Sequence, residues 1–249
     1  MPTVPYLGLQ FDARSLADMI AVLTADHPAC VTVVTPNVDH LVRLHAAEGP
    51  FAARLWSAYG DATLCINDSR ILARLAAWRG VRLPVVPGSD LTHDLLLHLR
   101  AGDRIAVIGG DGATVGELAA RCPGIEIVQH IPPMGLVRNP AALREAADFV
   151  VARQARFVFL AVGSPQQELL AQLIRADPAA RGVVLCIGAG IDFLTGRAAR
   201  APAWVQRAHL EWLHRLLSDP KRLWRRYLVD GPRILALAWR EPRPRADRQ

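Results

Sequence analysis

The sequence predicts an α/β protein with a Rossmann-like, mostly parallel sheet, helices on both faces of that sheet, and a C-terminal helical appendage. Three observations lead to this fold class. Six short runs are apolar throughout, which is typical of strands covered on both faces. Helical patterns lie between most of these runs, and such alternation indicates βαβ units with parallel strands. After Gly196 the strand-like runs stop, and only short helical segments follow.

The expected elements can be placed by residue range. Strands are expected at 30–35, 62–66, 104–109, 125–129, 156–163 and 182–188. Apolar residues recur with a helical period at 15–23, 71–78, 91–99, 116–122 and 142–151. The segments after Gly196 are broken at Pro202, Pro220 and Pro232. We therefore divide the chain into a core of residues 1–196, a basic helical appendage of residues 197–240, and a tail of residues 241–249 that we expect to be disordered.

The composition is that of a folded protein in a reducing compartment. The chain has 249 residues, of which 51% are hydrophobic, so it can bury a large core. Four scattered cysteines show neither CxxC spacing nor the density of a disulfide scaffold, and we expect buried free thiols at Cys30, Cys65, Cys122 and Cys186. The N-terminus lacks a signal-peptide pattern, and no run approaches the ~20 apolar residues of a membrane span. We expect a cytosolic protein whose membrane contact is peripheral.

The positive charge is concentrated in the last fifth of the chain. Residues 197–249 hold 13 Arg and Lys against 5 Asp and Glu, whereas the other 196 residues hold 16 against 18. Such a basic block usually contacts an anionic partner. No recognised nucleic-acid motif accompanies the charge, which argues against nucleic acid as that partner.

A helix that begins after Pro220 would have one basic flank beside an aromatic and aliphatic flank. The stacked i,i+4 pairs are Lys221 with Arg225, Arg222 with Arg226, Leu223 with Tyr227, and Trp224 with Leu228. Two interpretations stay open. The helix lies in a membrane interface, or it packs on the core and leaves a solvated basic face.

Small or polar residues follow five of the expected strands, where ligands bind in open α/β sheets. These strand ends are Thr35-Pro36-Asn37, Asn67-Asp68-Ser69, Gly110-Asp111-Gly112, residues 164–168, and Gly190-Ile191-Asp192. The turn in "VIGGDGATVGE" is rich in glycine and is either a diphosphate site or a plain tight turn. It matches neither GxGxxG nor GxxxxGK[ST]. Asp68 is either the N-cap of the following helix or a general base with a raised pKa.

The motifs of several other site classes are missing from the sequence. None of the eight histidines forms an HxH or HExxH pair, and no GxSxG occurs. We expect no bound metal and no cofactor.

Taken in order, several stretches resemble the WecG/TagA/CpsF family of bacterial glycosyltransferases (glycosyltransferase family 26). The stretches are "VVTPNVDHLVRL", "GSPQQELL", "GAGIDFLTGRAARAPAWVQR" and "LEWLHRLLSDPKRLWRRYL". The resemblance implies an inverting, metal-independent transfer from a UDP-sugar to a polyprenyl-diphosphate-linked saccharide in surface-polysaccharide biosynthesis. It also implies that the appendage is membrane-proximal and approaches an anionic inner-membrane surface.

The resemblance assigns roles residue by residue. The Thr-x-Asn motif of the family matches Thr35 and Asn37, its proposed base matches Asp68, and the glutamine of its PxQE motif matches Gln167, with Glu168 beside it. The appendage arginines of the family are represented by Arg215, Arg222, Arg225 and Arg226. We expect UDP against Gly109, Gly110 and Gly112, or against Gly188, Gly190 and Asp192. Asp68 would take the acceptor proton, and the arginines would supply positive charge to the leaving diphosphate in place of a metal.

Two departures from the family pattern stand out. Asp68 is followed by Ser69, where members of the family usually have glycine. Val85 and Val86 occupy the place of a family arginine, whose role would fall to Arg82 or Arg79 or be absent. We interpret this second departure as a sign of a donor other than UDP-ManNAc, so UDP-glucose and UDP-ManNAc-type donors both stay open.

Two other classes of function are alternatives to a glycosyltransferase. A Rossmann-type oxidoreductase predicts GxGxxG, which is missing from the sequence. A non-catalytic membrane-binding scaffold would use the basic appendage without turnover. Apolar surface under the appendage would support a homo-oligomer, and the oligomeric state stays open.

Overall fold

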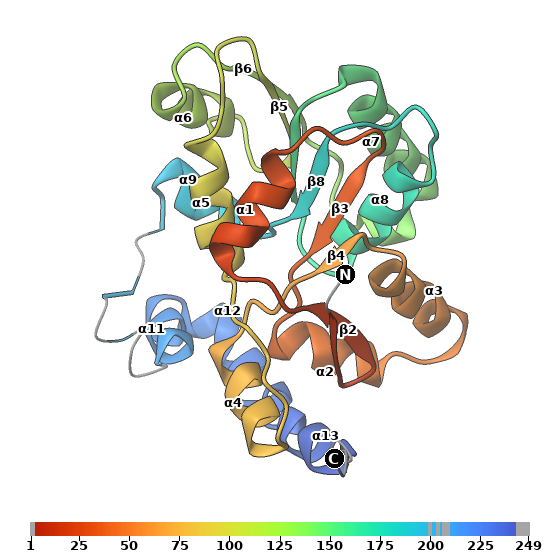
Figure 1. Ribbon diagram of the computed structural model, residues 1–249, viewed down its shortest axis with the longest axis vertical. Helices are drawn as coiled ribbons and strands as arrows, with labels where there is room; N and C mark the ends of the chain where they lie inside the picture. Colours follow the sequence, from red (N-terminus) through yellow and green to blue (C-terminus); the bar gives the residue numbers. More distant parts are fainter. Residues whose placement is uncertain (1–2, 199–200, 203–204, 206–209, 243–249) are drawn as a thin grey trace.

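The computed structural model describes residues 3–198, 201–202, 205 and 210–242, apart from the side chain of Arg222. Its centre is a six-stranded sheet in the order β4-β3-β8-β7-β5-β6, and every pairing within this sheet is parallel (Figure 1). The strands are β3 (Val31–Val34), β4 (Leu64–Cys65), β5 (Arg104–Gly109), β6 (Glu126–His130), β7 (Phe157–Ala161) and β8 (Val183–Cys186). The predicted α/β fold class is confirmed, and each of the six expected strands is present.

Helices cover both faces of the sheet (Figure 1). One face packs against α1 (Leu16–Thr24), α5 (Gly88–Leu96), α6 (Thr114–Arg121) and α9 (Gly190–Thr195). The other face packs against α2 (Val38–Ala46), α3 (Gly49–Gly60), α4 (Arg70–Trp78), α7 (Pro140–Arg153) and α8 (Gln166–Arg175), with the short 3-10 helix η1 (Leu136–Arg138) leading into α7.

Alternation along the strands divides the buried residues into two cores. Phe157 and Phe159 of β7 face the core under α1 and α5, whereas Val158 and Leu160 face the core under α7 and α8. All four side chains are fully buried. Because both faces are covered, the strand is apolar at every position, which is why it appears in the sequence as an unbroken run.

An antiparallel hairpin of β1 (Thr3–Tyr6) and β2 (Leu9–Asp12) precedes the sheet and was not predicted. Its two-residue turn has positive φ at Leu7 (48°) and Gly8 (78°), as in a type I′ turn. Leucine is rare in that conformation, so "LG" carries none of the usual hairpin signal. Helices α2 and α3 were also missing from the predicted elements.

The appendage consists of α11 (Glu211–Ser218), α12 (Pro220–Trp224), a π-helical segment η2 (Arg225–Asp230) and α13 (Arg233–Arg240). It packs on α2 and α4 of the core (Figure 1). Arg70 pairs with Glu211 at 3.2 Å, and the backbone N–H of Leu7 donates to the Glu241 carboxylate at 3.1 Å. Residues 243–249 of the expected tail lie outside the described residues.

The structure also bears on what was predicted for the cysteines and for membrane-spanning segments. The four cysteines are free and buried, as predicted. In the described parts of the chain, no helix is long and apolar enough to cross a membrane.

Candidate active site

A cavity of about 640 Å³ opens at the carboxyl ends of the parallel strands, within the size range of ligand pockets. We call it the strand-end cavity. Residues that follow every one of the six strands contribute to its wall, so the predicted cleft is present. The residues that line it include Thr35, Asn37, His40, Arg43, Asp68, Gly109, Gly110, Asp111, Gln167, Gly188, Gly190, Asp192, Phe193, Arg197, Arg215 and Arg226.

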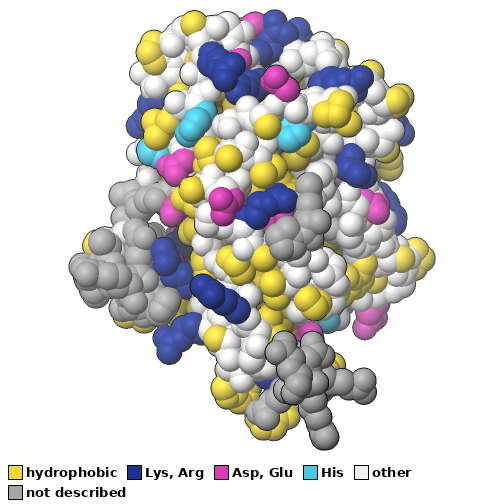
Figure 2. Space-filling view, viewed as in Figure 1, with side chains coloured by type: hydrophobic (Ala, Val, Ile, Leu, Met, Phe, Trp, Pro, Cys, Tyr) yellow, Lys and Arg dark blue, Asp and Glu magenta, His cyan; other side chains and the backbone are white. Residues whose placement is uncertain are grey.

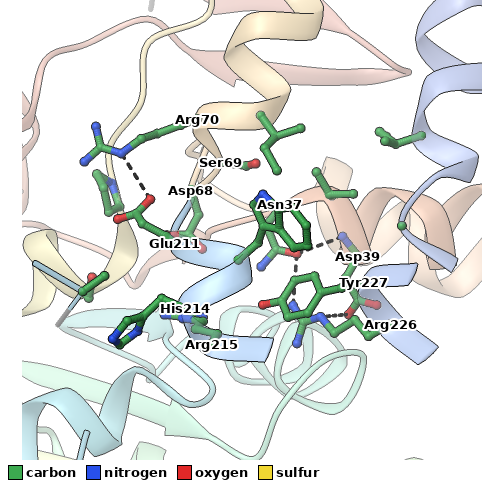
Figure 3. Close-up of a pocket in the computed structure, with 18 of the residues that line it drawn as sticks. Asn37, Asp39, Asp68, Ser69, Arg70, Glu211, His214, Arg215, Arg226 and Tyr227 are labelled. Carbon is green, nitrogen blue, oxygen red and sulfur yellow. Dashed lines mark hydrogen bonds and ion pairs between the residues drawn. The ribbon is translucent and has the colours of Figure 1, made fainter. Parts of the chain in front are cut away.

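A second cavity of about 430 Å³ lies between the core and the appendage. We call it the appendage cavity. Figure 3 shows Arg70 paired with Glu211 on one side of it, Arg226 with Asn37 and Asp39 on the other, and Asp68 between them. Residues lining both cavities include Asn37, Asp68, Phe193, Arg215 and Arg226. The two cavities therefore meet at Asp68.

Asp68 lies just beyond β4 and is held by the backbone of a neighbouring loop. The N–H of Gly88 donates to Asp68 Oδ1 at 2.7 Å. Burial raises the pKa of Asp68 to about 6, against the opposing effects of the Gly88 N–H and the Arg215 charge. A carboxylate with this pKa at the junction of two cavities can accept a proton near neutral pH.

The alternative role of Asp68 as a helix N-cap is wrong. Ser69 is the N-cap of α4, and its hydroxyl accepts from the N–H of Leu72 at 3.2 Å. Ser69 has φ −124°, which is ordinary extended backbone. Glycine is therefore not required after Asp68, which explains how the loop forms without it.

Thr35 and Asn37 follow β3 and have partly structural roles. The Thr35 hydroxyl donates to the carbonyl of Cys186 at 3.0 Å and so joins the ends of β3 and β8. Asn37 is the N-cap of α2, and its Oδ1 accepts from the N–H groups of Asp39 and His40. A hydrogen bond from Asn37 to Asp68 lowers the pKa of that carboxyl. Both residues line the strand-end cavity, as predicted.

Gln167 and Glu168 occupy the first turn of α8 and are almost completely buried, with exposed fractions of 1% and 0%. Gln167 Nε2 donates to Glu168 Oε1 at 3.0 Å, so the carboxyl group orients the amide. Gln167 Oε1 has no hydrogen-bond partner among the described residues and lies at the strand-end cavity. An unpaired buried acceptor is costly unless a ligand satisfies it.

The glycine-rich turn after β5 is shaped by packing. A Cβ on Gly109, where φ is +101°, would lie 2.8 Å from the carbonyl oxygen of Ala161, and one on Gly110 would lie 2.5 Å from Thr114 Oγ1. These contacts support the tight-turn interpretation. Gly109 and Gly110 nonetheless line the strand-end cavity, whereas Gly112 lines neither cavity.

The other predicted nucleotide-contacting set follows β8. Gly188, Gly190 and Asp192 all line the strand-end cavity. Gly188 has φ +49°, and a Cβ there would lie 3.3 Å from Gln167 Oε1. Glycine at this position therefore leaves room beside the unpaired amide oxygen.

The four predicted appendage arginines separate into different environments. Arg226 reaches inward to Asp39 at 3.4 Å and to Asn37 Oδ1 at 3.5 Å. Arg215 lies over the ring of Phe193, 5.2 Å from its centroid. The side chain of Arg225 is 76% exposed and lines neither cavity. The side chain of Arg222 is outside the described residues.

Neither suggested replacement for the family arginine reaches the site. Val86 is buried in the core. Arg82 is exposed, and Arg79 donates to the backbone carbonyl of Glu241, so both lie away from the cavities. The structure instead places Arg43 and Arg197 at the strand-end cavity, and the sequence analysis missed both. Arg43 is four residues after Asp39 on α2, a spacing that would have indicated an ion pair.

Arg197 and His40 also line the strand-end cavity. Arg197 donates to Asp111 at 2.7 and 2.8 Å and to Glu117 at 3.0 Å, so its charge is matched by carboxylates. Burial lowers the pKa of His40 well below its usual value, helped by the charges of Arg43 and Arg226. His40 is therefore neutral at physiological pH. In the parts of the chain that the structure describes, no group of three or more His, Cys, Asp or Glu could hold a metal ion.

Comparison with known proteins identifies the class of protein to which this chain belongs. Residues 4–248 match the model of a group of glycosyl transferases. The chain belongs to the Glycosyl transferase WecG/TagA/CpsF family, which confirms the resemblance. A curated relative is the N-acetylglucosaminyldiphosphoundecaprenol N-acetyl-beta-D-mannosaminyltransferase of Bacillus spizizenii, which is 36% identical over 115 residues. That alignment covers 46% of this chain and 42% of the relative.

Proposed function

We propose that the protein is an inverting, metal-independent glycosyltransferase that moves a sugar from a UDP-sugar to a polyprenyl-diphosphate-linked saccharide during assembly of a bacterial surface polysaccharide. The observation that carries this proposal is the meeting of two cavities at Asp68. A transfer between two large substrates needs two binding spaces with the base at their junction. The family membership supports this class of reaction.

The donor occupies the strand-end cavity in this proposal. The turns at Gly109–Gly110 and Gly188–Gly190 bring backbone close to the ligand, as a nucleotide diphosphate requires. Gln167 Oε1 accepts a hydrogen bond from a donor hydroxyl or from the uracil N–H. Replacement of Gln167 by Ala then lowers kcat/KM about tenfold, whereas the same change at Gln172, which donates to Ser57 and Asp61 and lines neither cavity, has no effect. Equal kinetics for both variants would remove Gln167 from the site.

The acceptor occupies the appendage cavity. Trp212, Tyr227, Ile234 and Leu235 give this cavity apolar walls, which suit a lipid-linked substrate. Asp68 removes the proton from the acceptor hydroxyl, whose oxygen attacks the anomeric carbon from the side opposite UDP. Arg215 and Arg226 border both cavities and offset the charge that develops on the leaving diphosphate.

An exposed aromatic surface gives the protein a site for the membrane. Trp78 of α4 and Trp239 of α13 are 53% and 66% exposed, and their rings lie 5.6 Å apart. Figure 2 shows hydrophobic side chains at this end of the molecule and basic side chains beside it, over α4 and the appendage. Tryptophan with adjacent positive charge is typical of contact with an anionic membrane interface. We place the enzyme at the inner face of the plasma membrane on this basis.

Membrane binding can be tested separately from transfer. Vesicles that contain anionic phospholipid should retain the wild-type protein in a flotation assay and lose the W78A/W239A double variant. Leu97 is 71% exposed and is the C-cap residue of α5, so L97A is the matched control. Equal flotation of all three proteins would remove this surface from the membrane contact.

The transfer itself is tested with purified protein in detergent and EDTA. Polyprenyl-diphosphate-glucose and polyprenyl-diphosphate-GlcNAc are each incubated with UDP-glucose, UDP-ManNAc, UDP-GlcNAc or UDP-glucuronate, and the lipid product is weighed by mass spectrometry. One added sugar identifies the donor and demonstrates metal independence. Turnover that requires added Mg²⁺ would overturn the metal-independent mechanism. Lipid binding without turnover across the whole panel would favour the scaffold alternative.

A further inference from the structure

Arg43 is a cation of the core that belongs to the strand-end cavity alone. It lies on α2 and lines this cavity but not the appendage cavity. Its Nη1 donates to the backbone carbonyl of Ser164 at 2.8 Å, and its Nη2 donates to the Asp39 carboxylate. Ser164 lies in the loop between β7 and α8, so the guanidinium group is fixed over the end of a central strand.

The other arginines of the strand-end cavity differ from Arg43. Arg197 donates from three nitrogens to Asp111 and Glu117, which match its charge. Arg215 and Arg226 come from the appendage and border both cavities. Arg43 has five N–H donors, and its two hydrogen bonds to described residues engage two of them. Its side chain is 43% exposed, so the remaining donors are open to a ligand.

Asp39 is shared between two guanidinium groups. Its Oδ2 accepts from Arg43 and lies 3.4 Å from Arg226 Nε. One carboxylate between two arginines leaves a net positive charge on this group of three side chains, of which Arg43 and Arg226 line the strand-end cavity. The carboxylate also fixes the side-chain angle of Arg43, which reduces the entropy lost when a ligand binds.

We propose that Arg43 binds the diphosphate of the nucleotide-sugar donor, positioned by Asp39 and by the carbonyl of Ser164. This inference rests on the proposed function. In the transfer step, the bond between the anomeric carbon and the β-phosphate oxygen breaks, and its electron pair stays on that oxygen. The acceptor oxygen forms the new bond, and its proton passes to Asp68. Arg43 stabilises the negative charge that UDP gains.

The diphosphate of the lipid acceptor is a second candidate ligand, and the placement of Arg43 argues against it. Arg43 lines only the cavity assigned to the donor. Arg43 should therefore affect the KM for the UDP-sugar and leave the KM for the lipid unchanged.

The test measures binding of UDP, uridine and inorganic pyrophosphate to wild-type protein, R43M, R43K and R54M by calorimetry. Arg54 is exposed on α3 and lines neither cavity, so R54M is the matched control. R43M should bind UDP and pyrophosphate about 10- to 100-fold more weakly and bind uridine unchanged, because one charge-assisted hydrogen-bond pair is lost. R43K should fall between wild type and R43M, and R54M should match wild type.

The possible results separate a failure of the role proposed for Arg43 from a failure of the proposed glycosyltransferase function. Wild-type affinity for UDP in R43M, or an equal loss for UDP and uridine, would overturn the role of Arg43. If wild-type protein binds pyrophosphate through Arg43 but shows no preference for UDP, the anion site stands and the nucleotide donor is wrong. If wild-type protein binds neither ligand, the inference fails. If R43M raises the KM for the lipid acceptor alone, Arg43 binds the acceptor diphosphate and the inference is wrong.

Discussion

The core side and the appendage side of the active site are held in place by different kinds of interaction. Asp68 accepts the backbone N–H of Gly88 just beyond β4, and Gln167 is almost completely buried in the first turn of α8. Arg226 is 31% exposed and held by side-chain contacts, and the nearby Arg70–Glu211 pair is 29% and 40% exposed. Partly exposed pairs of this kind contribute little stability each. The proposed base is therefore held by the backbone of the core, whereas Arg226 is held to the core by partly exposed side-chain contacts.

The largest expected effect comes from the core side. Asp68→Asn should lower kcat by about 10²–10⁴, because the amide retains an acceptor for the Gly88 N–H but cannot take a proton. In the wild-type enzyme, kcat should fall as pH drops below about 6, where Asp68 becomes protonated. Steady-state kinetics from pH 5 to 9 measure both effects. Full activity in D68N would assign the base elsewhere and weaken the contrast between the two sides.

A smaller effect is expected on the appendage side. Arg226→Met should lower kcat/KM about 10- to 100-fold, because it removes a charge that borders both cavities. The neighbouring Arg225 is exposed and lines neither cavity, so R225M should retain activity in detergent. Thermal melts of both variants should match the wild type within about 1 kcal/mol. A large loss of stability in R226M would mean that this contact holds the appendage more strongly than the comparison implies.

A third effect concerns the stability that the core gives up to keep Asp68 in place. The pKa of Asp68 is above that of an unfolded aspartate, so the folded state favours the protonated form. The wild-type protein therefore loses stability as pH rises from about 4 to 6. At pH 8, D68N should unfold with a free energy about 1–3 kcal/mol higher than that of the wild type, and at pH 3.5 the two should be equal. Denaturant titrations at both pH values measure this difference, and D68N less stable than wild type at pH 8 contradicts it.

The smallest effect tests the residue next to the base. Ser69→Ala removes the N-cap of α4 and should cost about 1 kcal/mol, or about 3 °C in Tm. Ser69→Gly should cost only a few tenths of a kcal/mol. Differential scanning calorimetry resolves the two variants. If both variants have kinetics close to those of the wild type, Ser69 has only a structural role. A loss of kcat in S69A alone would show that Ser69 helps to position Asp68.

The parallel sheet was predictable because burial on both faces produces an unbroken apolar run. The runs near 104–109 and 156–163 therefore carried a clear signal. The β1–β2 hairpin carried none, because Leu7 adopts a left-handed conformation that its sequence does not favour. The π-helical turn Arg225–Asp230 was equally unpredictable. Within this segment Arg226 contacts Asp39, whereas Arg225 is exposed.

Part of the lining of the strand-end cavity was predictable. Asp68, Thr35, Asn37 and Gln167 could be located there because strand ends converge in this type of fold. Arg43 could not, because its role depends on the distance between α2 and the loop after β7, which local sequence does not specify. Gly112 belongs to the same predicted set as Gly109 and Gly110, but it lines neither cavity.

The hydrogen bond between the Leu7 N–H and Glu241 joins the turn between β1 and β2 to the residue that follows α13. A ribosome makes the chain from the N-terminus, so the sheet and Asp68 can form before the appendage emerges. Arg226 reaches Asp39 only after the segment that carries it has been synthesised. The nascent chain thus contains Arg43 and Asp68 before Arg226, and a chain that stalls before the appendage is made should hold the proposed base without the appendage arginines that border both cavities.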